Sequence, residues 1–420
     1  MRKLVLITVL ALALALIVTL APACGGGGEE PTPPPGTTPT PKATPTSTPQ
    51  AKVLKMGALC SLSGPAAQWG TQILWGIEWA VDKYNETGFK VGKDTYTIKL
   101  VTGDDKFLGS SAAQEITRLI SSESIHYVSG PIATFDAIAP IAEQGKCFVF
   151  NMTNDQSFVG TDRPYSFIGA PPITTWNATF WDQAYADPDM AAVKTAAILT
   201  PDPNLYDKQV AADKAALESH GSEVVIIQRY TAFAQDYYPI LTPVVAKHPD
   251  LVSLNAGNIG DQSLMVKQLR ELGYKGIIGG PSHGDPESAI PFAGCAASEG
   301  FRTNDPDYSS NLYPESVRSL YAEFQTLHPG QALPLTTYLG YGSVQLYVQA
   351  IQAAGSTDPD QVMKVFDDPN FKFEYFGSSG VTLGGAQTWG NRRVINDEVC
   401  YSKIINCKKV MTSRKPAVTP

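Results

Sequence analysis

The sequence predicts an α/β protein built from two doubly wound, Rossmann-like lobes, each containing a parallel sheet. From residue 52 to about residue 280, short apolar runs alternate with longer segments of helical periodicity. The apolar runs lack the polar–apolar alternation of a half-exposed strand, which indicates parallel strands covered on both faces. The pattern occurs twice, before and after YSFIGAPP at 165–172, so we expect two lobes. A chain of 420 residues is also long for one hydrophobic core.

The first run predicts four strands separated by three helices. On one face of the first helix, Ile73, Ile77 and Val81 follow the spacing of a helix that packs on a sheet. The expected strands are 53–59, 96–103, 125–130 and 147–151, and the expected helices are 67–86, 110–121 and 134–144.

The second run repeats this order. Its expected strands are 195–202, 224–230, 251–257 and 276–280, and its expected helices are 206–219, 237–247 and 261–272. After residue 300, helices are expected at 314–327 and 341–354, followed by a β-rich segment that includes 394–410. That segment is too long for a simple cap, so we expect the chain to cross back between the lobes. The predicted boundaries are 51–169 with 302–388 for lobe 1, 170–301 with 389–411 for lobe 2, and a polar, frayed tail at 412–420.

The N-terminus carries a targeting pattern. Two basic residues precede an apolar run at 4–20, and small residues then lead to Cys24 and four glycines. This pattern resembles a bacterial lipoprotein signal, with 1–23 removed and Cys24 acylated. An uncleaved membrane anchor and plain secretion are the alternatives, and the two leading interpretations both place the body outside the cytoplasm. Residues 24–50, rich in Gly and then in Pro and Thr, predict an extended tether to the membrane.

Composition excludes several kinds of partner. Asp and Glu outnumber Lys and Arg by 40 to 32, which argues against nucleic acid because phosphate binding needs a basic surface. The five His and six Cys show no metal-ligand spacing, so we expect no metal and no cofactor. No P-loop occurs, and no GxGxxG stands in the right context, which argues against a nucleotide.

The predicted carboxyl ends of the strands are rich in Gly, Ser, Thr and Asn. Open parallel sheets bind ligands at these ends, and each end leads into a helix N-terminus whose N–H groups favour a small carboxylate or carbonyl. The segments are CSLSGPAAQWG, SGPIATFD, FNMTND, TPDPNLYD, NAGNIGD and GGPSHGD.

Together with DKYNETG, LVTGDDKF and TPDPNLYDKQVAADKAALESHGSEVV, these segments carry a family resemblance that runs from 52 to 409. The sequence resembles the branched-chain amino acid type of periplasmic binding protein, the receptors of ABC importers. The resemblance implies a type I fold with two lobes joined by three crossover strands, and closure on a ligand between them. It also implies a monomer without enzymatic activity that delivers its ligand to a membrane permease.

The resemblance also implies ligand contacts. Thr134, with Phe135 after it, caps the helix that binds the ligand carboxylate, and Thr153 and Asn154 lie in the next loop. The other implied contacts are Trp69 over the ligand side chain, Tyr206 from the second lobe, and Asn258 at a position where an aromatic residue is common.

One position departs from the family pattern. Amino acid binders carry an acid after the GGP-type strand end, whereas this chain has Ser282 or His283 there. A buried ammonium without a carboxylate is costly. Either Asp155, Asp207 or Asp261 replaces the acid, or the ligand lacks an amine and is an aromatic or aliphatic carboxylate or an amide.

Two other functions are weighed. GPSHG at 280–284 matches the nucleophile elbow of a serine hydrolase, with Ser282 as nucleophile. Pro286 interrupts the helix that this motif requires, and His328 is the one later histidine. An extracytoplasmic ligand sensor is the third interpretation, although no signalling domain is attached.

The cysteines leave their pairing open. Cys400 and Cys407 flank YSKIIN in a predicted strand pair and could form a bridge in an oxidising compartment. Cys60, Cys147 and Cys295 are expected to be buried thiols.

Overall fold

The computed structural model describes residues 51–202, 206–255, 257, 259–281 and 286–419. The chain divides into two compact units, Met1–Thr48 and Pro49–Pro420, and every described residue belongs to the second unit. The lipidation candidate Cys24 and the tether at 24–50 therefore lie outside the described residues. Within the described ranges, no helix is both long enough and apolar enough to cross a bilayer.

The first sheet has nine strands among the described residues, in the order β12-β13-β14-β6-β5-β4-β1-β3-β2. Its central strands pair in parallel, whereas β2 and the β12–β13 hairpin add antiparallel pairs at its two edges. The strands are β1 (Lys52–Cys60), β2 (Phe89–Val91), β3 (Asp94–Asp104), β4 (Tyr127–Ser129), β5 (Phe148–Asn151), β6 (Ser166–Ile168), β12 (Lys372–Tyr375), β13 (Ser378–Gly384) and β14 (Val394–Asn396).

Helices cover both faces of this sheet, as two-sided burial of its strands requires. Along β1, Met56 and Ala58 join one core cluster with α1 and α11, while Leu59 joins the other with α2 and α3. The helices of this lobe are α1 (Ala67–Thr87), α2 (Gly109–Ser121), α3 (Phe135–Gln144), α10 (Glu315–Leu327), α11 (Leu335–Ala354), α12 (Pro359–Asp367), α13 (Ala386–Trp389) and the 3-10 turn η1 (Gln156–Phe158).

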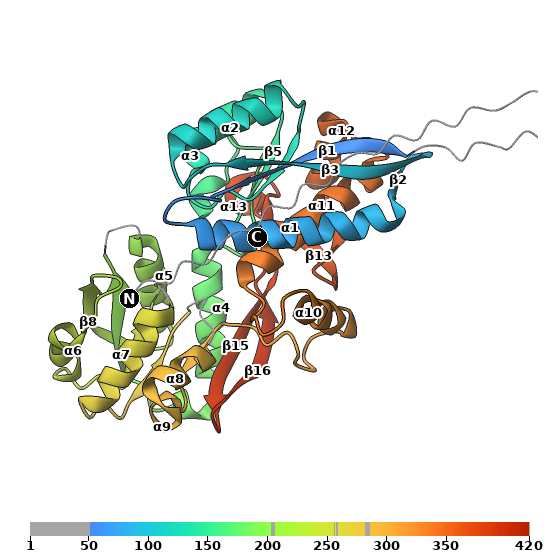
Figure 1. The fold of residues 1–420 in the computed structure, drawn as a ribbon. Helices are drawn as coiled ribbons and strands as arrows, with labels where there is room; N and C mark the ends of the chain where they lie inside the picture. Colours follow the sequence, from blue (N-terminus) through green and yellow to red (C-terminus); the bar gives the residue numbers. More distant parts are fainter. Residues whose placement is uncertain (1–50, 203–205, 256, 258, 282–285, 420) are drawn as a thin grey trace, which may run out of the picture. The chain divides into compact units, whose positions relative to one another are not determined.

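Glycines let α1 and α11 approach closely, and the two helices lie side by side in Figure 1. A Cβ atom on Gly76 would lie 2.0 Å from the carbonyl oxygen of Thr337, and one on Gly340 would lie 2.4 Å from that of Ile73. The backbones therefore touch where side chains would otherwise separate them.

The second sheet has seven strands in the described part of the chain, in the order β16-β15-β11-β10-β9-β7-β8. Strands β11 to β8 are parallel, and the β15–β16 hairpin adds an antiparallel edge. The strands are β7 (Thr195–Pro201), β8 (Glu223–Tyr230), β9 (Leu251–Leu254), β10 (Ile277–Gly279), β11 (Arg302–Thr303), β15 (Glu398–Ile405) and β16 (Lys408–Pro416).

Helices again cover both faces of the second sheet. One core cluster holds α4 and α5, and another holds α6 and α7 with the short turns that follow β10. The elements are α4 (Ile173–Tyr185), η2 (Pro188–Met190), α5 (Asp207–Ser219), α6 (Tyr238–Val245), α7 (Ile259–Glu271), η4 (Pro286–Ala289), α8 (Ile290–Ala293) and α9 (Cys295–Ser298). Each sheet with the helices packed on it forms one lobe.

The chain passes between the sheets three times within the described residues, as predicted. It crosses between β6 and α4, after β11, and between β14 and β15. At the third crossing Asp397 accepts a hydrogen bond from the hydroxyl of Tyr338 at 2.7 Å. The predicted α/β fold with two doubly wound lobes and three crossovers is confirmed.

Several local predictions differ from the structure. The segment expected to be a frayed tail at 412–420 continues β16 to Pro416 and then bonds Asp397 and Asn396 through Ala417 and Thr419. The reason is that β15 would otherwise leave its outer edge unpaired. Helices α4 and α12 were not predicted, and α11 begins six residues early, at Leu335.

The predicted lobe boundaries stay a prediction, but two strands pair in a sheet of the other lobe than the one predicted. Strand β14 pairs in the first sheet although 389–411 was assigned to lobe 2, and β11 pairs in the second sheet although residue 302 was assigned to lobe 1.

The cysteine prediction is corrected. Cys407 is bonded to Cys295, and Cys400 is a buried thiol whose sulfur lies 3.1 Å from the hydroxyl of Tyr313. Closeness in sequence suggested Cys400 as the partner of Cys407, but the partner is Cys295, the first residue of α9. Cys60 and Cys147 are buried thiols, as expected.

Candidate functional site

A cavity of about 800 Å³ is lined by residues from both lobes. The first lobe contributes the start of α1 and the loop after β5, through Gln68, Trp69, Gln72, Met152, Thr153 and Asn154. The second lobe contributes Gln209 on α5, Glu287 and Ser288 on η4, and Lys408 and Lys409 on β16. The remaining wall is formed by 305–309 after the second crossing, by 331–336 with Leu339 around the start of α11, and by Ala170 and Tyr321.

The apolar part of the cavity centres on Trp69, whose exposed fraction is 48%. Its neighbour Gly70 brings the first turn of α1 against the chain after β1, because a Cβ atom there would lie 2.0 Å from the carbonyl oxygen of Ser61. Met152, Leu333 and Leu339 also line the cavity and are each less than one-tenth exposed. These side chains suit an apolar or aromatic ligand body.

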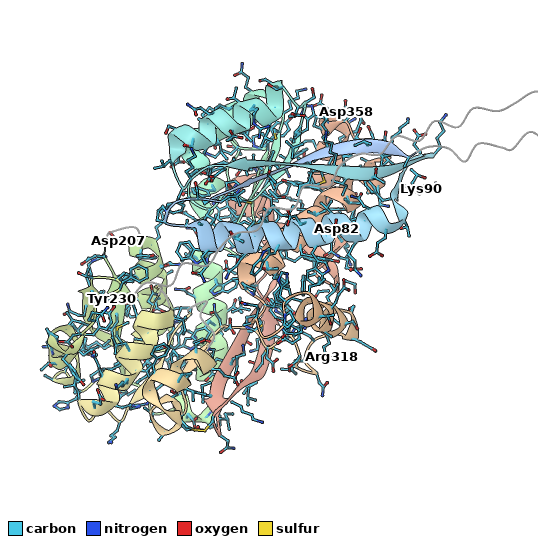
Figure 2. The ribbon with its side chains drawn as sticks, in the orientation of Figure 1. Asp82, Lys90, Asp207, Tyr230, Arg318 and Asp358 are labelled. Atoms are coloured by element: carbon cyan, nitrogen blue, oxygen red, sulfur yellow. A yellow bond between two sulfur atoms is a disulfide. The ribbon has the colours of Figure 1, made fainter. Side chains whose placement is uncertain are left out.

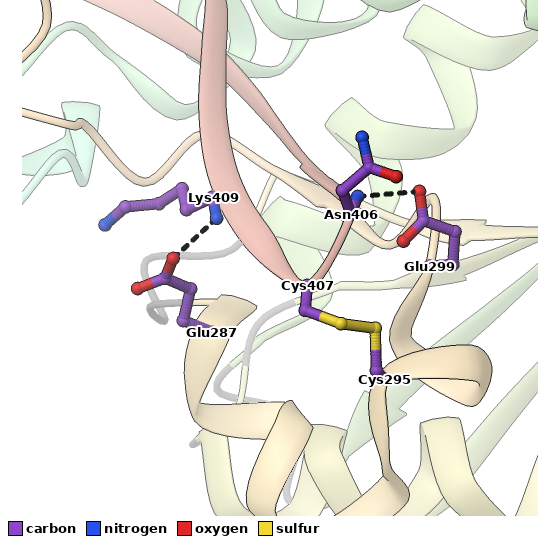
Figure 3. The surroundings of a disulfide bond; sticks show 6 residues. All are labelled: Glu287, Cys295, Glu299, Asn406, Cys407 and Lys409. Carbon is purple, nitrogen blue, oxygen red and sulfur yellow. Dashed lines mark hydrogen bonds between the residues drawn. A yellow bond between two sulfur atoms is a disulfide. The ribbon is translucent and has the colours of Figure 1, made fainter.

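The acidic residues that line the cavity have hydrogen-bond donors within the protein. Lys409 donates from Nζ to Asp305 at 2.6 Å, and its backbone N–H donates to Glu287 Oε1 at 2.6 Å, as Figure 3 shows for the second bond. Asp307 accepts hydrogen bonds from the backbone and hydroxyl of Ser309. Because these carboxylates already have donors, they are less available to pair with a ligand cation.

Three predicted contacts meet at the cavity. Trp69, Thr153 and Asn154 all line it, although Trp69 is more than 80 residues away from the other two in the sequence. The loop is held by a bond from the backbone N–H of Asp155 to Thr153 Oγ1, and by one from that of Ile173 to the carbonyl oxygen of Asn154. Their contact with a ligand stays a prediction.

Thr134 and Phe135 lie differently from the expectation. Thr134 is the residue before α3, as predicted, but its hydroxyl donates to buried Asp105 at 2.9 Å. Asp105 also accepts from the hydroxyl of Ser61 at 2.5 Å. Phe135 is 1% exposed and packs against Phe158 with 4.8 Å between ring centroids. Neither residue is part of the cavity lining described above.

Other predicted site residues are placed as follows. Tyr206 precedes α5, is half-buried, and does not line the cavity; burial raises the pKa of its hydroxyl. Asn258, Ser282 and His283 lie outside the described residues. His328 directly follows α10 and stacks on Trp75 at 4.4 Å between ring centroids.

The three acids proposed as substitutes for the missing carboxylate all have protein partners. Asp155 pairs with Lys208, Asp207 with Arg229, and Asp261 accepts the backbone N–H of Phe233 at 3.1 Å. Asp207 lies at the start of α5 and Tyr230 at the end of β8, near the same edge of the second sheet (Figure 2).

Polar side chains are also buried near the carboxyl ends of β7 and β9 in the second sheet. Thr200 Oγ1 and Asn255 Oδ1 are buried without a hydrogen-bond partner, as is Gln209 Oε1 beside the cavity. Below them, fully buried Asp213 accepts hydrogen bonds from Trp181 and Ser253. Burial raises the pKa of Asp213 to about 6, although these donors oppose the shift.

Sequence reasoning missed the cavity wall built after residue 300. Tyr308 follows β11, a two-residue strand that was not predicted, and Leu333 and Leu339 follow α10 and not a strand, so the rule that ligands bind at strand ends did not find them. Pro334 was a signal in the sequence for the start of α11, because Pro is favoured at the start of a helix. Across the described residues, no group of three or more His, Cys, Asp or Glu is arranged to hold a metal ion.

Two doubly wound lobes, three crossings and a cavity between the lobes define the class of two-lobed binding proteins. The chain belongs to the periplasmic binding protein family, since the profile of that family matches residues 53–390. Membership in this family implies a location outside the cytoplasm.

Individual relatives support the branched-chain amino acid type. The Leu/Ile/Val-binding protein BraC3 of Rhizobium johnstonii is 24% identical over 321 residues, which cover 73% of this chain and 80% of BraC3. The substrate-binding protein LivJ of Streptococcus pneumoniae, solved with isoleucine, has a TM-score of 0.69 and 19% identity, covering 88% of this chain and 100% of LivJ. A solute-binding protein of R. palustris, solved with benzoate, has a TM-score of 0.68 and 19% identity, covering 88% of this chain and 98% of that protein. The predicted resemblance is confirmed.

Proposed function

We propose that this protein is the extracytoplasmic solute-binding receptor of an ABC importer and captures a small organic ligand between its lobes. The observation that carries the proposal is the cavity lined by α1 and the β5 loop from one lobe and by α5 and η4 from the other. A ligand held there contacts both lobes at once, so it stabilises the closed form by its greater affinity for that form. The permease then recognises the closed receptor, and no covalent chemistry takes place.

The cavity lining favours a ligand with an apolar or aromatic body and a polar end. Trp69, Met152 and Leu339 receive the body, and the uncharged groups of Thr153, Asn154 and Gln209 receive the polar end. The acids near this site already have partners, which favours an aromatic or aliphatic carboxylate or an amide over an amino acid. The relatives solved with isoleucine and benzoate represent the two alternatives.

Thermal unfolding of the 49–420 unit against a ligand panel tests this proposal. The panel holds branched-chain amino acids, aromatic acids, short aliphatic acids and amides at about 1 mM. A micromolar ligand then adds about 4 kcal/mol of stability, enough to raise the melting temperature by several degrees. Shifts with benzoate-like acids alone support the amine-free ligand, and shifts with leucine support the amino acid. The absence of any shift would contradict the proposed ligand class.

A hydrolase is tested separately with a chromogenic ester. A receptor shows no turnover that depends on Ser282, so Ser282→Ala and the unchanged protein give the same background rate. Loss of turnover in Ser282→Ala would instead favour the hydrolase.

We further propose that the protein is a monomer anchored to the membrane through acylated Cys24, with 24–50 as its tether. The sequence pattern around Cys24 supports this proposal. The full chain should fractionate with membranes and enter the detergent phase, whereas Cys24→Ser should remain in the aqueous phase. Membrane retention of Cys24→Ser would favour an uncleaved anchor.

A further inference from the structure

An ion pair joins the two lobes next to the cavity. Lys208 lies in the first turn of α5 in the second lobe, and Asp155 directly precedes η1 in the first lobe. The Nζ atom of Lys208 lies 2.9 Å and 3.1 Å from the two carboxylate oxygens of Asp155, and 3.0 Å from the hydroxyl of Ser157. One ammonium group therefore makes three contacts across the gap between the lobes.

The sequence neighbours of this pair line the cavity. Asn154 directly precedes Asp155, and Gln209 directly follows Lys208. Both neighbours line the cavity, one from each lobe. Asn154 also accepts the backbone N–H of Ile173, the first residue of α4 after the first crossing. The ion pair thus connects the two cavity walls. It lies next to Asn154, which is hydrogen-bonded to the first crossing between the lobes, and this crossing must bend when the lobes move.

The Asp155 side of the pair is preorganised. Its carboxylate accepts the backbone N–H and the hydroxyl of Ser157, at 2.9 Å and 2.8 Å, and its own N–H donates to Thr153. Burial opposes ionisation, but the Ser157 hydrogen bonds and Lys208 hold the pKa of Asp155 below its usual value. The Ser157 hydrogen bonds therefore hold the carboxylate in place independently of Lys208. Asp155 belongs to a rigid turn, and Lys208 is the exposed, movable partner.

In the described part of the chain, the neighbouring charged residues pair within one lobe. Arg163 binds the carbonyl oxygen of Ser157 and pairs with Asp136 and Asp162, all within the first lobe. Asp207 pairs with Arg229, which keeps that pair within the second lobe. Lys208, by contrast, pairs with Asp155 in the other lobe.

We propose that Asp155 and Lys208 are positioning residues that latch the closed form of the receptor and thereby tune ligand affinity and its dependence on salt. The inference rests on the proposed function, since closure is what the latch serves. Neither side chain lines the cavity, so the pair acts on the equilibrium between open and closed forms and not on the ligand itself. Opening the lobes separates Lys208 from Asp155, and salt screens their attraction.

The first experiment measures closure without a ligand. Spin labels are placed at Leu108→Cys in the first lobe and Phe292→Cys in the second, two exposed positions. The distance distribution between the labels is recorded at about 20 mM and about 500 mM NaCl. At low salt, Lys208→Met should lower the ratio of closed to open forms roughly twofold to fivefold, the range for a partly exposed ion pair. Lys208→Arg should retain the ratio.

Lys214→Met is the matched control. Lys214 lies on the same helix and pairs with Glu218 inside the second lobe, so its removal costs a charge without breaking an interlobe contact. It should leave the closed fraction unchanged at both salt concentrations. Equal closed fractions in Lys208→Met and the unchanged protein at low salt would overturn the latch.

The second experiment measures affinity with leucine and benzoate as probes. For whichever probe binds, Lys208→Met and Asp155→Asn should each raise Kd roughly twofold to fivefold at low salt, and the double variant should add little. The effect should disappear at about 500 mM NaCl. Additive effects, or a loss confined to benzoate when both probes bind, would assign Lys208 to direct ligand binding and reject the latch. If neither probe binds, the proposed function is judged by the full ligand panel, and the spin-label result still decides the latch.

Discussion

Cys407, at the tip of the β15–β16 hairpin, is disulfide-bonded to Cys295 at the start of α9, 112 residues earlier in the chain (Figure 3). Two hydrogen bonds flank the bridge: Glu299 accepts the backbone N–H of Asn406, and Glu287 accepts that of Lys409. Glu287 and Lys409 both line the cavity. The disulfide therefore fastens the edge hairpin of the second sheet to the segment that forms one cavity wall.

Removing this disulfide should destabilise the protein. Cross-linking residues so far apart restricts the unfolded chain, and the loss of such a bridge costs about 2–5 kcal/mol. Cys295→Ser combined with Cys407→Ser should lower the urea midpoint, and reductant should lower the midpoint of the unchanged protein by a similar amount. Reductant should not affect the double variant, because Cys60, Cys147 and Cys400 are already buried thiols. An unchanged midpoint under reductant would contradict the prediction.

The sequence predicted the order of strands and helices because that order depends on local composition. The apolar run at 195–202 indicates a buried strand whichever strands are its neighbours in the sheet. The structure has β7 at Thr195–Pro201. Trp69, Thr153 and Asn154 were implied by the family resemblance, and all three line one cavity because each follows a strand of one parallel sheet.

The remaining features depend on tertiary neighbours that a local pattern does not contain. Thr134 was correctly placed before a helix, but its hydroxyl bonds Asp105 because that carboxylate is buried next to it. The cavity wall at 331–336 comes from a segment with no strand before it, and disulfide pairing cannot be read from spacing.

Trp69 offers a direct test of the cavity as the ligand site. Trp69→Ala removes the exposed aromatic wall, so it should weaken binding of any panel ligand about tenfold, or about 1.4 kcal/mol. It should change the melting temperature little because Trp69 is half-exposed in the absence of ligand. Trp75→Ala is the control: it lies on the same helix and stacks on His328, outside the cavity lining. Equal affinity in the two variants, measured by titration calorimetry, would place the ligand elsewhere.

Gly340 in α11 should resist substitution although it lies inside a helix. Alanine normally stabilises such a position by about 0.5–1 kcal/mol. Here the added Cβ would lie 2.4 Å from the carbonyl oxygen of Ile73, so α1 and α11 must separate. We expect Gly340→Ala to lower the free energy of unfolding by about 1–3 kcal/mol. Gln352→Ala, at an exposed position of the same helix, serves as control in urea unfolding. A stabilised Gly340→Ala would show that the helices can move apart freely.

Asp213 should make stability depend on pH. Its pKa is about 6 in the folded protein and near the usual 3.8 in the unfolded chain. Between these values the folded form binds more protons, so the stability that protonation provides is complete below about pH 4 and is lost as the pH rises through 6. The loss for this group amounts to about 3 kcal/mol.

Asp213→Asn removes the titrating proton while it keeps an oxygen for Trp181 Nε1, and the hydroxyl of Ser253 can rotate to accept from the new amide. The free energy of unfolding, measured in urea at pH 4.5 and pH 7, should therefore fall less with pH in the variant than in the unchanged protein. The variant's advantage grows as pH increases because only the unchanged protein must ionise a carboxyl group in a fully buried site. A difference between the two proteins that is the same at both pH values would show that Asp213 titrates alike in the folded and unfolded chains.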